Sequence, residues 1–242
     1  MTQFLLSLLF PLSLLSCHNA TSKQTTETRQ QASTQLSTSE KVDTTDTILS
    51  HTIYTQADSA RVVELLKMKP TGNDALFYAR KLKGIPYVAS TLEVADPEQL
   101  VVNLRELDCT TLVETTLALA LTKRQHSDSF ADYCHNLQRL RYWDGQMNGY
   151  LSRLHYFSWW WHNNKDKGII KEVTLPTKYT TVINVQNNYM SVHPDRYKFL
   201  KLHPEWVDSI ARMEQRYNGP DGRYLMEQYT SLSQMSPVDQ EM

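Results

Sequence analysis

The chain has 242 residues, of which 40% are hydrophobic and 21% charged, and its formal net charge is −1. This balance lacks the basic excess that neutralises phosphates, so no nucleic-acid partner is expected. The three cysteines, Cys17, Cys109 and Cys134, are too few and odd in number for a disulfide framework, so each needs its own explanation.

An apolar run over residues 4–15 opens the chain and is followed by Ser16 and Cys17. The run is too short to cross a bilayer as a helix, and it has the length of a signal-peptide core. Its end, LLSC, resembles the lipobox of bacterial lipoproteins. Residues 1–17 are therefore predicted to be a lipoprotein signal peptide, with Cys17 lipidated and the protein anchored to the cell envelope, facing the periplasm or the cell surface. A plain secretory signal with a chance cysteine is the alternative.

Residues 18–50 are rich in Thr, Ser and Gln and contain few large apolar side chains. Such a segment cannot bury enough surface to offset the entropy of ordering it, so a disordered linker is predicted. Residues 51–242 remain, and their length suits one domain with a sizeable core.

Helices are predicted first over residues 58–69 and then from Asn73 or Asp74 to Leu82, with Gly84 as a stop signal. A strand is predicted over residues 100–104. Further on, the pattern predicts a helix over 128–139, an aromatic-rich segment over 150–162 that starts as a helix, a strand over 168–175 and a helix over 205–217.

Helical periodicity begins at Cys109, and Asp108 before it is a good N-cap candidate. The apolar stripe predicted to face the core comprises Leu112, Val113, Leu117, Ala120 and Leu121. No metal-ligand spacing and no phosphate-binding loop stand out, so neither a metal nor a cofactor is expected.

Cys109 is the cysteine placed for chemistry. At a helix N-terminus, backbone N–H groups lack internal partners and the helix dipole favours a thiolate, which can attack a carbonyl. A small buried cysteine is the alternative, and so is a disulfide to Cys134. Cys134 itself is expected on the buried face of a helix, where a thiol is inert.

Three sequence runs resemble hallmarks of a family of N-acetylmuramoyl-L-alanine amidase-like proteins, which are papain-like cysteine amidases of the NlpC type. They are residues 104–114, LRELDCTTLVE; residues 149–158, GYLSRLHYFS; and residues 190–194, MSVHP, followed by Tyr197 and Leu200. The resemblance covers about residues 58–230, which corresponds to the N-terminal part of the family's domain.

The resemblance implies an α+β, papain-like fold in which the helical N-terminal half is present. It also implies a cell-wall amidase that cleaves the amide bond between N-acetylmuramic acid and L-alanine of muropeptides, with Cys109 as the nucleophile. Substrate contacts are expected from Asp108, Arg153, His155 and Tyr156. The sequence leaves two roles open for Arg153: pairing with a stem-peptide carboxylate, or holding a loop in place.

The sequence departs from the family pattern where the family's histidine is expected, because the Ser-His-x-Gly context is absent. The domain over 51–242 is therefore predicted to be truncated at its C-terminus, with most of the following sheet missing, and its activity is in doubt. His155 is the in-chain candidate for a substitute base, although a hydrogen-bonded structural histidine is the commoner case. The alternative function is a non-catalytic, lipid-anchored protein that binds peptidoglycan or peptide.

Overall fold

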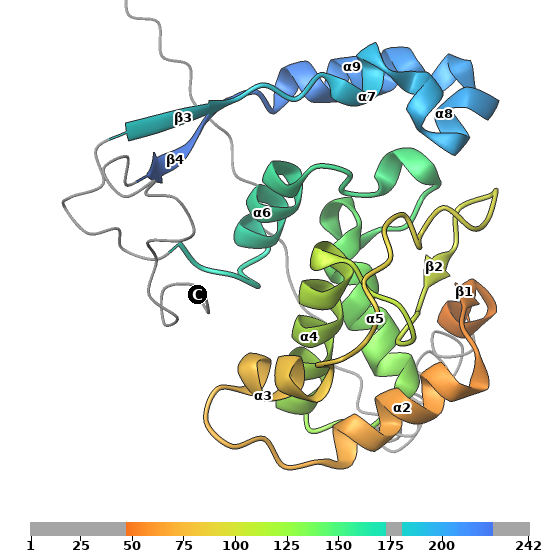
Figure 1. The fold of residues 1–242 in the computed structure, drawn as a ribbon, viewed down its shortest axis with the longest axis vertical. Helices are drawn as coiled ribbons and strands as arrows, with labels where there is room; N and C mark the ends of the chain where they lie inside the picture. The colour runs from red at the N-terminus through yellow and green to blue at the C-terminus, as the bar shows by residue number, and fades with distance from the viewer. Residues whose placement is uncertain (1–46, 173–180, 225–242) are drawn as a thin grey trace, which may run out of the picture. The chain divides into compact units, whose positions relative to one another are not determined.

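The computed structural model describes residues 47–172 and 181–224, all within one compact unit that spans residues 43–242 (Figure 1). This part of the chain is rich in helices and contains two small two-stranded sheets. Its larger elements in chain order are β1 (Thr52–Ile53), α2 (Gln56–Lys67), α3 (Asp74–Lys81), β2 (Leu100–Val101), α4 (Cys109–Arg124), α5 (Phe130–Arg141), α6 (Phe157–Asp166), β3 (Thr181–Val185), α7 (Tyr189–Val192), α8 (Lys198–Leu202), α9 (Val207–Arg216) and β4 (Gly219–Tyr224).

Side-chain caps fix where the first four long helices begin. Thr55, Asn73, Asp108 and Ser129 each accept a hydrogen bond from a backbone N–H in the first turn of α2, α3, α4 and α5, respectively. Such caps satisfy donors that have no partner inside the helix, and each is worth about 1 kcal/mol. The predicted N-caps Asn73 and Asp108 are thus confirmed. Gly84, the predicted stop, adopts a φ of 91° three residues after α3 ends.

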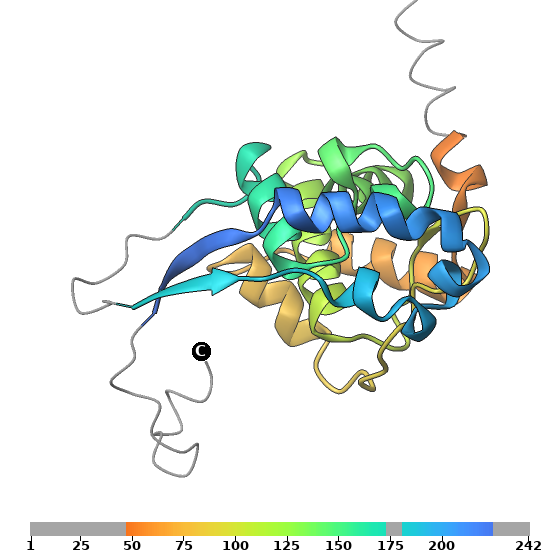
Figure 2. The same ribbon diagram turned by 90° about the horizontal axis from the view of Figure 1, so that it is seen from above.

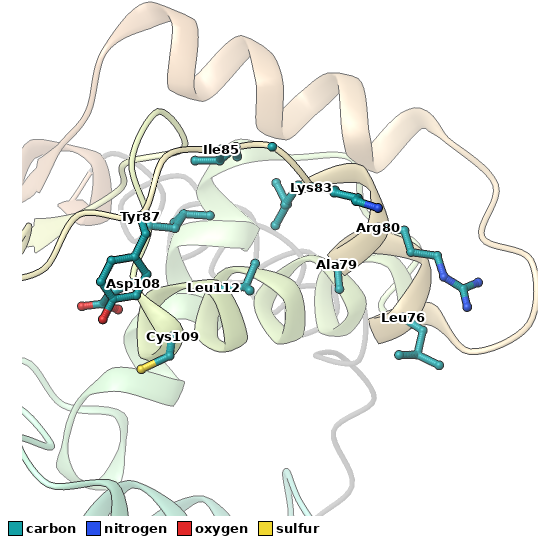
Figure 3. A pocket seen from close by; sticks show the side chains of 12 residues that line it. Leu76, Ala79, Arg80, Lys83, Ile85, Tyr87, Asp108, Cys109 and Leu112 are labelled. Atoms are coloured by element: carbon teal, nitrogen blue, oxygen red, sulfur yellow. The ribbon is translucent and has the colours of Figure 1, made fainter. Parts of the chain in front are cut away.

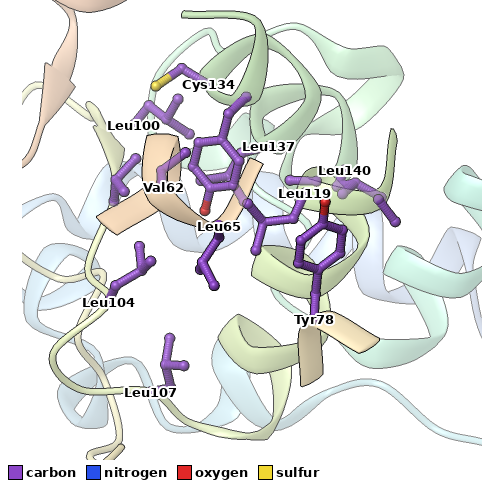
Figure 4. Packing of buried hydrophobic residues seen from close by; sticks show 14 of the residues in the cluster. Val62, Leu65, Tyr78, Leu100, Leu104, Leu107, Leu119, Cys134, Leu137 and Leu140 are labelled. Carbon is purple, nitrogen blue, oxygen red and sulfur yellow. The ribbon is translucent and has the colours of Figure 1, made fainter. Parts of the chain in front are cut away.

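The main core lies where α2, α3 and α5 pack around α4 (Figure 4). Leu65 of α2, Tyr78 of α3, Leu119 of α4 and Leu140 of α5 are all fully buried. Burial of a side chain of this size contributes about 1.5–3 kcal/mol, so this cluster holds α4 in place.

The face that α4 buries differs from the predicted stripe. Val113 is 44% exposed, and of the five predicted residues only Ala120 is fully buried. The buried face instead carries Thr111, Glu114, Thr115, Thr116, Ala118, Leu119, Ala120 and Thr122. Polar groups are tolerated there where they find buried partners: Thr122 Oγ1 donates to the carbonyl of Ala118 at 2.8 Å. The prediction was wrong for Val113 and missed the buried polar positions, whereas Leu112, Leu117 and Leu121 are partly buried and pack against the main core as predicted. Apolar periodicity does not reveal the partners that let polar groups be buried.

Short parallel pairings lead the chain into α4. Thr52 and Ile53 of β1 pair in register with Leu100 and Val101 of β2, so the predicted strand over 100–104 is confirmed only in its first two residues. An isolated parallel bridge joins Tyr87 to Leu107, just before Asp108. These pairings fix the backbone of the segment that leads into α4.

The later helices α7, α8 and α9 lie together (Figure 2), and a second, smaller core lies among them. It comprises Tyr150, Met190, Phe199, Leu200 and Ile210. The helix predicted over 205–217 corresponds to α9, preceded by a 3₁₀ turn at Pro204–Trp206. β3 and β4, which flank α7, α8 and α9 in the chain, pair as a two-stranded antiparallel sheet. The strand predicted over 168–175 was wrong for residues 168–172, which form turns and coil, and its last three residues lie outside the described chain.

The predicted signal peptide over 1–17 with Cys17, and most of the predicted linker over 18–50, lie outside the described residues. Residues 47–50 form a helical turn, and Ile48 is buried in the main core. Folded structure therefore begins at least four residues before the predicted domain start at 51. In the described ranges, no helix combines the length and apolar character needed to cross a membrane.

Candidate functional site

Cys109 is the first residue of α4, and its side chain is exposed (Figure 3). Cys134 is buried in the main core, and burial raises the pKa of its thiol to about 12. Both cysteines are free thiols. Cys109 is thus neither packed inside nor joined to Cys134, and its sulfur is open to a substrate.

The first turn of α4 leaves two donors free beside the Cys109 thiol. The Asp108 carboxylate accepts hydrogen bonds from the N–H and the hydroxyl of Thr111, both at 2.8 Å. Among the described residues, the N–H groups of Cys109 and Thr110 have no acceptor. Free N–H groups at a helix N-terminus stabilise negative charge, so this turn can hold both a thiolate and an oxyanion.

An apolar groove of about 540 Å³ opens on one side of Cys109 (Figure 3). α3, the segment after it and the start of α4 form its walls. The lining residues are Leu76, Ala79, Arg80, Leu82, Lys83, Gly84, Ile85, Tyr87, Leu107, Asp108, Cys109 and Leu112.

Tyr87 is a residue of this groove that sequence reasoning missed. Its side chain is 71% exposed and lies beside Asp108 and Cys109 (Figure 3). The backbone holds it there, since the Val88 N–H donates to the Leu107 carbonyl at 3.1 Å. Pro86 favours an extended conformation in the residue before it, but the sequence does not reveal that this segment pairs with the residues before Cys109.

A charged pocket of about 390 Å³ lies on the other side, and Asp108 lines both hollows. It gathers residues from the loop after Tyr87, from α4 and α5, from the segment before α6, and from the start of α8 with the two residues before it. The lining residues are Ser90, Leu92, Glu93, Asp108, Thr110, Glu114, Arg141, Arg153, Leu154, His155, Arg196, Tyr197 and Lys198. Three of the predicted substrate contacts, Asp108, Arg153 and His155, thus meet in one pocket next to the nucleophile candidate.

Arg153 is buried at the pocket wall, with its side chain 6% exposed, and pairs with two carboxylates. One guanidinium nitrogen lies 2.5 Å from Glu93 Oε1, and Nε lies 3.5 Å from Glu98 Oε1. Burial raises the pKa of Glu98, partly offset by the charge of Arg153. The Tyr142 hydroxyl donates to Glu98 at 2.9 Å. Arg153 therefore ties the loop that carries Glu93 and Glu98 to the pocket.

A second buried ion pair forms the floor of the charged pocket. Arg141 Nε lies 2.7 Å from Glu114 Oε2, and both side chains are at most 4% exposed. Arg141 also donates to the Val101 carbonyl at 2.7 Å. Glu114 thus joins α4 to α5.

His155 and Tyr156 are adjacent in the chain but make hydrogen bonds in different parts of the structure. His155 Nε2 lies 2.9 Å from the Tyr150 carbonyl oxygen. The Tyr156 hydroxyl donates to Glu214 Oε1 at 2.6 Å, and Glu214 also accepts from the Met190 N–H at 3.1 Å. Tyr156 lines neither hollow at Cys109. Its hydrogen bonds instead connect it to Met190 of α7 and Glu214 of α9.

Burial, with the nearby charge of Arg153, lowers the pKa of His155 to about 3. We therefore expect its imidazole to stay neutral from pH 5 to pH 8, which NMR of the ring protons can check. An unfolded chain binds this proton below about pH 6.5, whereas the folded protein binds it only near pH 3. This residue should therefore lower stability as pH falls through that window. A titration midpoint near 6.5 in the folded protein would contradict the lowered pKa of His155.

The sequence also missed three cations of the charged pocket, Arg141, Arg196 and Lys198. Their distances along the chain from Cys109 gave no signal that they would meet it. In the described part of the chain, no group of three His, Cys, Asp or Glu side chains is arranged to hold a metal ion.

Comparison with known proteins gives a family match over residues 78–236, to AmiA-like, N-acetylmuramoyl-L-alanine amidase-like proteins. No curated protein matches the chain. A crystal structure of an N-acetylmuramoyl-L-alanine amidase from Bacteroides uniformis is 40% identical with a TM-score of 0.53, covering 60% of this chain and 61% of that one. A structure described as a candidate xylanase from Bacteroides fragilis is 45% identical with a TM-score of 0.51, covering 56% and 58%.

The chain thus spans about 61% of the length of the Bacteroides uniformis amidase. The family match covers well over half of this chain and includes Cys109 and both hollows beside it except for Leu76. The chain therefore belongs to the AmiA-like family of N-acetylmuramoyl-L-alanine amidase-like proteins.

Proposed function

We propose that this protein is a cysteine-dependent cell-wall amidase that acts on the bond between N-acetylmuramic acid and L-alanine in muropeptides. The observation that carries the proposal is the exposed Cys109 thiol at the start of α4, between an apolar groove and a charged pocket. A muropeptide joins a sugar to a charged peptide through the amide to be cleaved, and it needs a different surface on each side of the nucleophile.

In the proposed reaction, the Cys109 thiolate attacks the amide carbonyl carbon and forms the C–S bond. The carbonyl oxygen becomes an oxyanion, which the free N–H groups of Cys109 and Thr110 stabilise. Collapse of this intermediate breaks the C–N bond, and the leaving amine takes up a proton. Water then hydrolyses the thioester, which releases the carboxylate and regenerates the thiol.

The amine needs a proton donor, and His155 does not supply one. With a pKa of about 3 its imidazole is neutral near pH 7, so no imidazolium is present to protonate the amine, and it is the one histidine among the described residues that lines the charged pocket. This observation favours the second candidate function, a protein that binds peptidoglycan fragments without cleaving them. General acid–base catalysis contributes roughly 10²–10⁴-fold, so its loss would leave turnover slow but binding intact.

We also propose a papain-like arrangement and an anchored location. A nucleophilic cysteine at the N-terminus of a central helix supports the papain-like reading. The sequence LLSC at residues 14–17 supports lipidation of Cys17 and attachment to the cell envelope. Mass spectrometry of the membrane fraction would test this: a mature protein that keeps residues 1–16 or lacks acyl chains would contradict it.

The function is tested by incubating the full chain with purified muropeptides. Released stem peptide, separated by liquid chromatography, is expected if the protein is an amidase. Binding of the same muropeptides without release would favour the non-catalytic function. Absence of both would refute either form of the proposal.

A further inference from the structure

We infer that Arg196, assisted by Lys198, is the specificity residue that reads a carboxylate on the peptide part of the substrate. The inference rests on the proposed function and deepens it by naming the chemistry of the charged pocket's ligand, an acidic peptide attached through L-alanine. Both side chains line that pocket and are exposed.

The charge balance of the pocket carries the inference. Glu93 is paired with Arg153, and Glu114 is paired with Arg141. Asp108 is occupied in capping α4. Each carboxylate of the lining thus has a partner inside the protein.

Arg196 has no carboxylate partner among the described residues. Within the described residues no carboxylate lies within ion-pairing distance of its guanidinium, and none lies within that distance of Lys198. Two uncompensated cations at the mouth of a pocket attract an anion, and a guanidinium binds a carboxylate through two parallel hydrogen bonds.

The structure also holds this segment in place. Arg196 ends a 3₁₀ turn, Pro194–Arg196, whose N–H donates to the His193 carbonyl at 3.0 Å. Phe199 and Leu200 directly after it are buried in the second core. Lys198 Nζ donates to the Glu93 carbonyl at 3.2 Å. A cation on a fixed turn loses little freedom when it binds, which favours a role in recognition.

Arg153 is less suited to this task, although it lies deeper in the same pocket. Its guanidinium already faces both Glu93 and Glu98. A substrate carboxylate would have to displace one of them and leave a buried charge without its partner, which is costly. Arg153 therefore positions the loop, and Arg196 meets the ligand.

The experiment measures binding in the Cys109→Ala protein, so that no ligand is cleaved. Two ligands are compared by calorimetry: N-acetylmuramoyl-L-alanyl-D-glutamate, and the same compound with both carboxylates converted to amides. Each is titrated into the Cys109→Ala protein and into versions that also carry Arg196→Gln, Lys198→Gln or Arg212→Gln. Arg212 is an exposed arginine of α9 that lines neither hollow, so its substitution is the matched control.

The acidic ligand should bind about 10-fold more tightly than the diamide, which is about 1.4 kcal/mol. Arg196→Gln should remove most of this preference by weakening the acidic ligand alone, Lys198→Gln should remove less, and Arg212→Gln should change nothing. Equal binding of the two ligands, or a preference that survives Arg196→Gln, would overturn the inference and leave the proposed function standing. Failure of both ligands to bind would remove the proposed function and this inference with it.

Discussion

Replacing Cys109 by alanine is expected to reduce release of stem peptide from muropeptides by about 10³-fold or more, because no other group on α4 can form the acyl intermediate. Binding of the muropeptide should persist, since Cys109 is the one residue lining the two hollows that is altered, and it loses only its sulfur. Stability should also persist, because the side chain is exposed and its removal creates no cavity. The measurements are a chromatographic assay of released peptide, calorimetric binding and a thermal melt of each variant.

Cys134 provides the internal control. Iodoacetamide should label Cys109 in the native protein and stop turnover, whereas Cys134 should react only after unfolding, because burial raises the pKa of its thiol to about 12. Mass spectrometry of peptides from native and denatured samples would show this order. Turnover that is unaffected by Cys109→Ala, or labelling of Cys134 in the native protein, would refute the assignment of the nucleophile.

The position of Cys109 at the start of α4 was predictable because its determinants are local. A polar residue that can cap, followed at once by helical periodicity, predicts a helix start, and Asp108 and Cys109 take up those positions. The same reasoning located α3 from Asn73. Free N–H groups at such a start follow from helix geometry alone.

The buried face of α4 was not predictable in this way. Its inward positions include Glu114 and Thr122, which sequence periodicity assigns to solvent. Glu114 is buried because Arg141 reaches it from α5, and Thr122 accepts a hydrogen bond from Asn136 Nδ2 at 3.0 Å. Such pairings join residues far apart in the chain, and a single sequence carries no signal of them.

The charged pocket, too, could be predicted from the sequence only in part. Arg153 and His155 were selected because a motif surrounds them, but their environment was decided by Glu93, Glu98 and Tyr150. Arg153 pairs with Glu93 and Glu98 and so holds their loop in place, which is one of the two roles that the sequence left open for it. This pairing also leaves Arg196, which no motif argument had singled out, as the uncompensated cation of the pocket.

The Arg141–Glu114 pair is expected to matter most for stability. Glu114→Ala would leave the Arg141 guanidinium buried without its carboxylate, and breaking a buried pair from one side costs about 3–5 kcal/mol. For a folded unit of this size, that corresponds to a melting temperature lower by about 6–20 °C. Thermal melts followed by circular dichroism would measure the change.

The double variant Glu114→Met, Arg141→Met distinguishes two effects on the free energy of unfolding: the loss of the attraction between the two charges, and the burial of the Arg141 charge without a partner. If the unpaired buried charge has the larger effect, the double variant should be clearly more stable than Glu114→Ala, because no unpaired ion remains inside it. Beyond the ion pair, it loses only the hydrogen bond to the Val101 carbonyl. Glu64→Ala is the matched control, since its pair with Arg61 is exposed and worth at most about 1 kcal/mol. A Glu114→Ala protein that melts with the parent would mean that water reaches Arg141, and that the floor of the charged pocket is not closed as the structure has it.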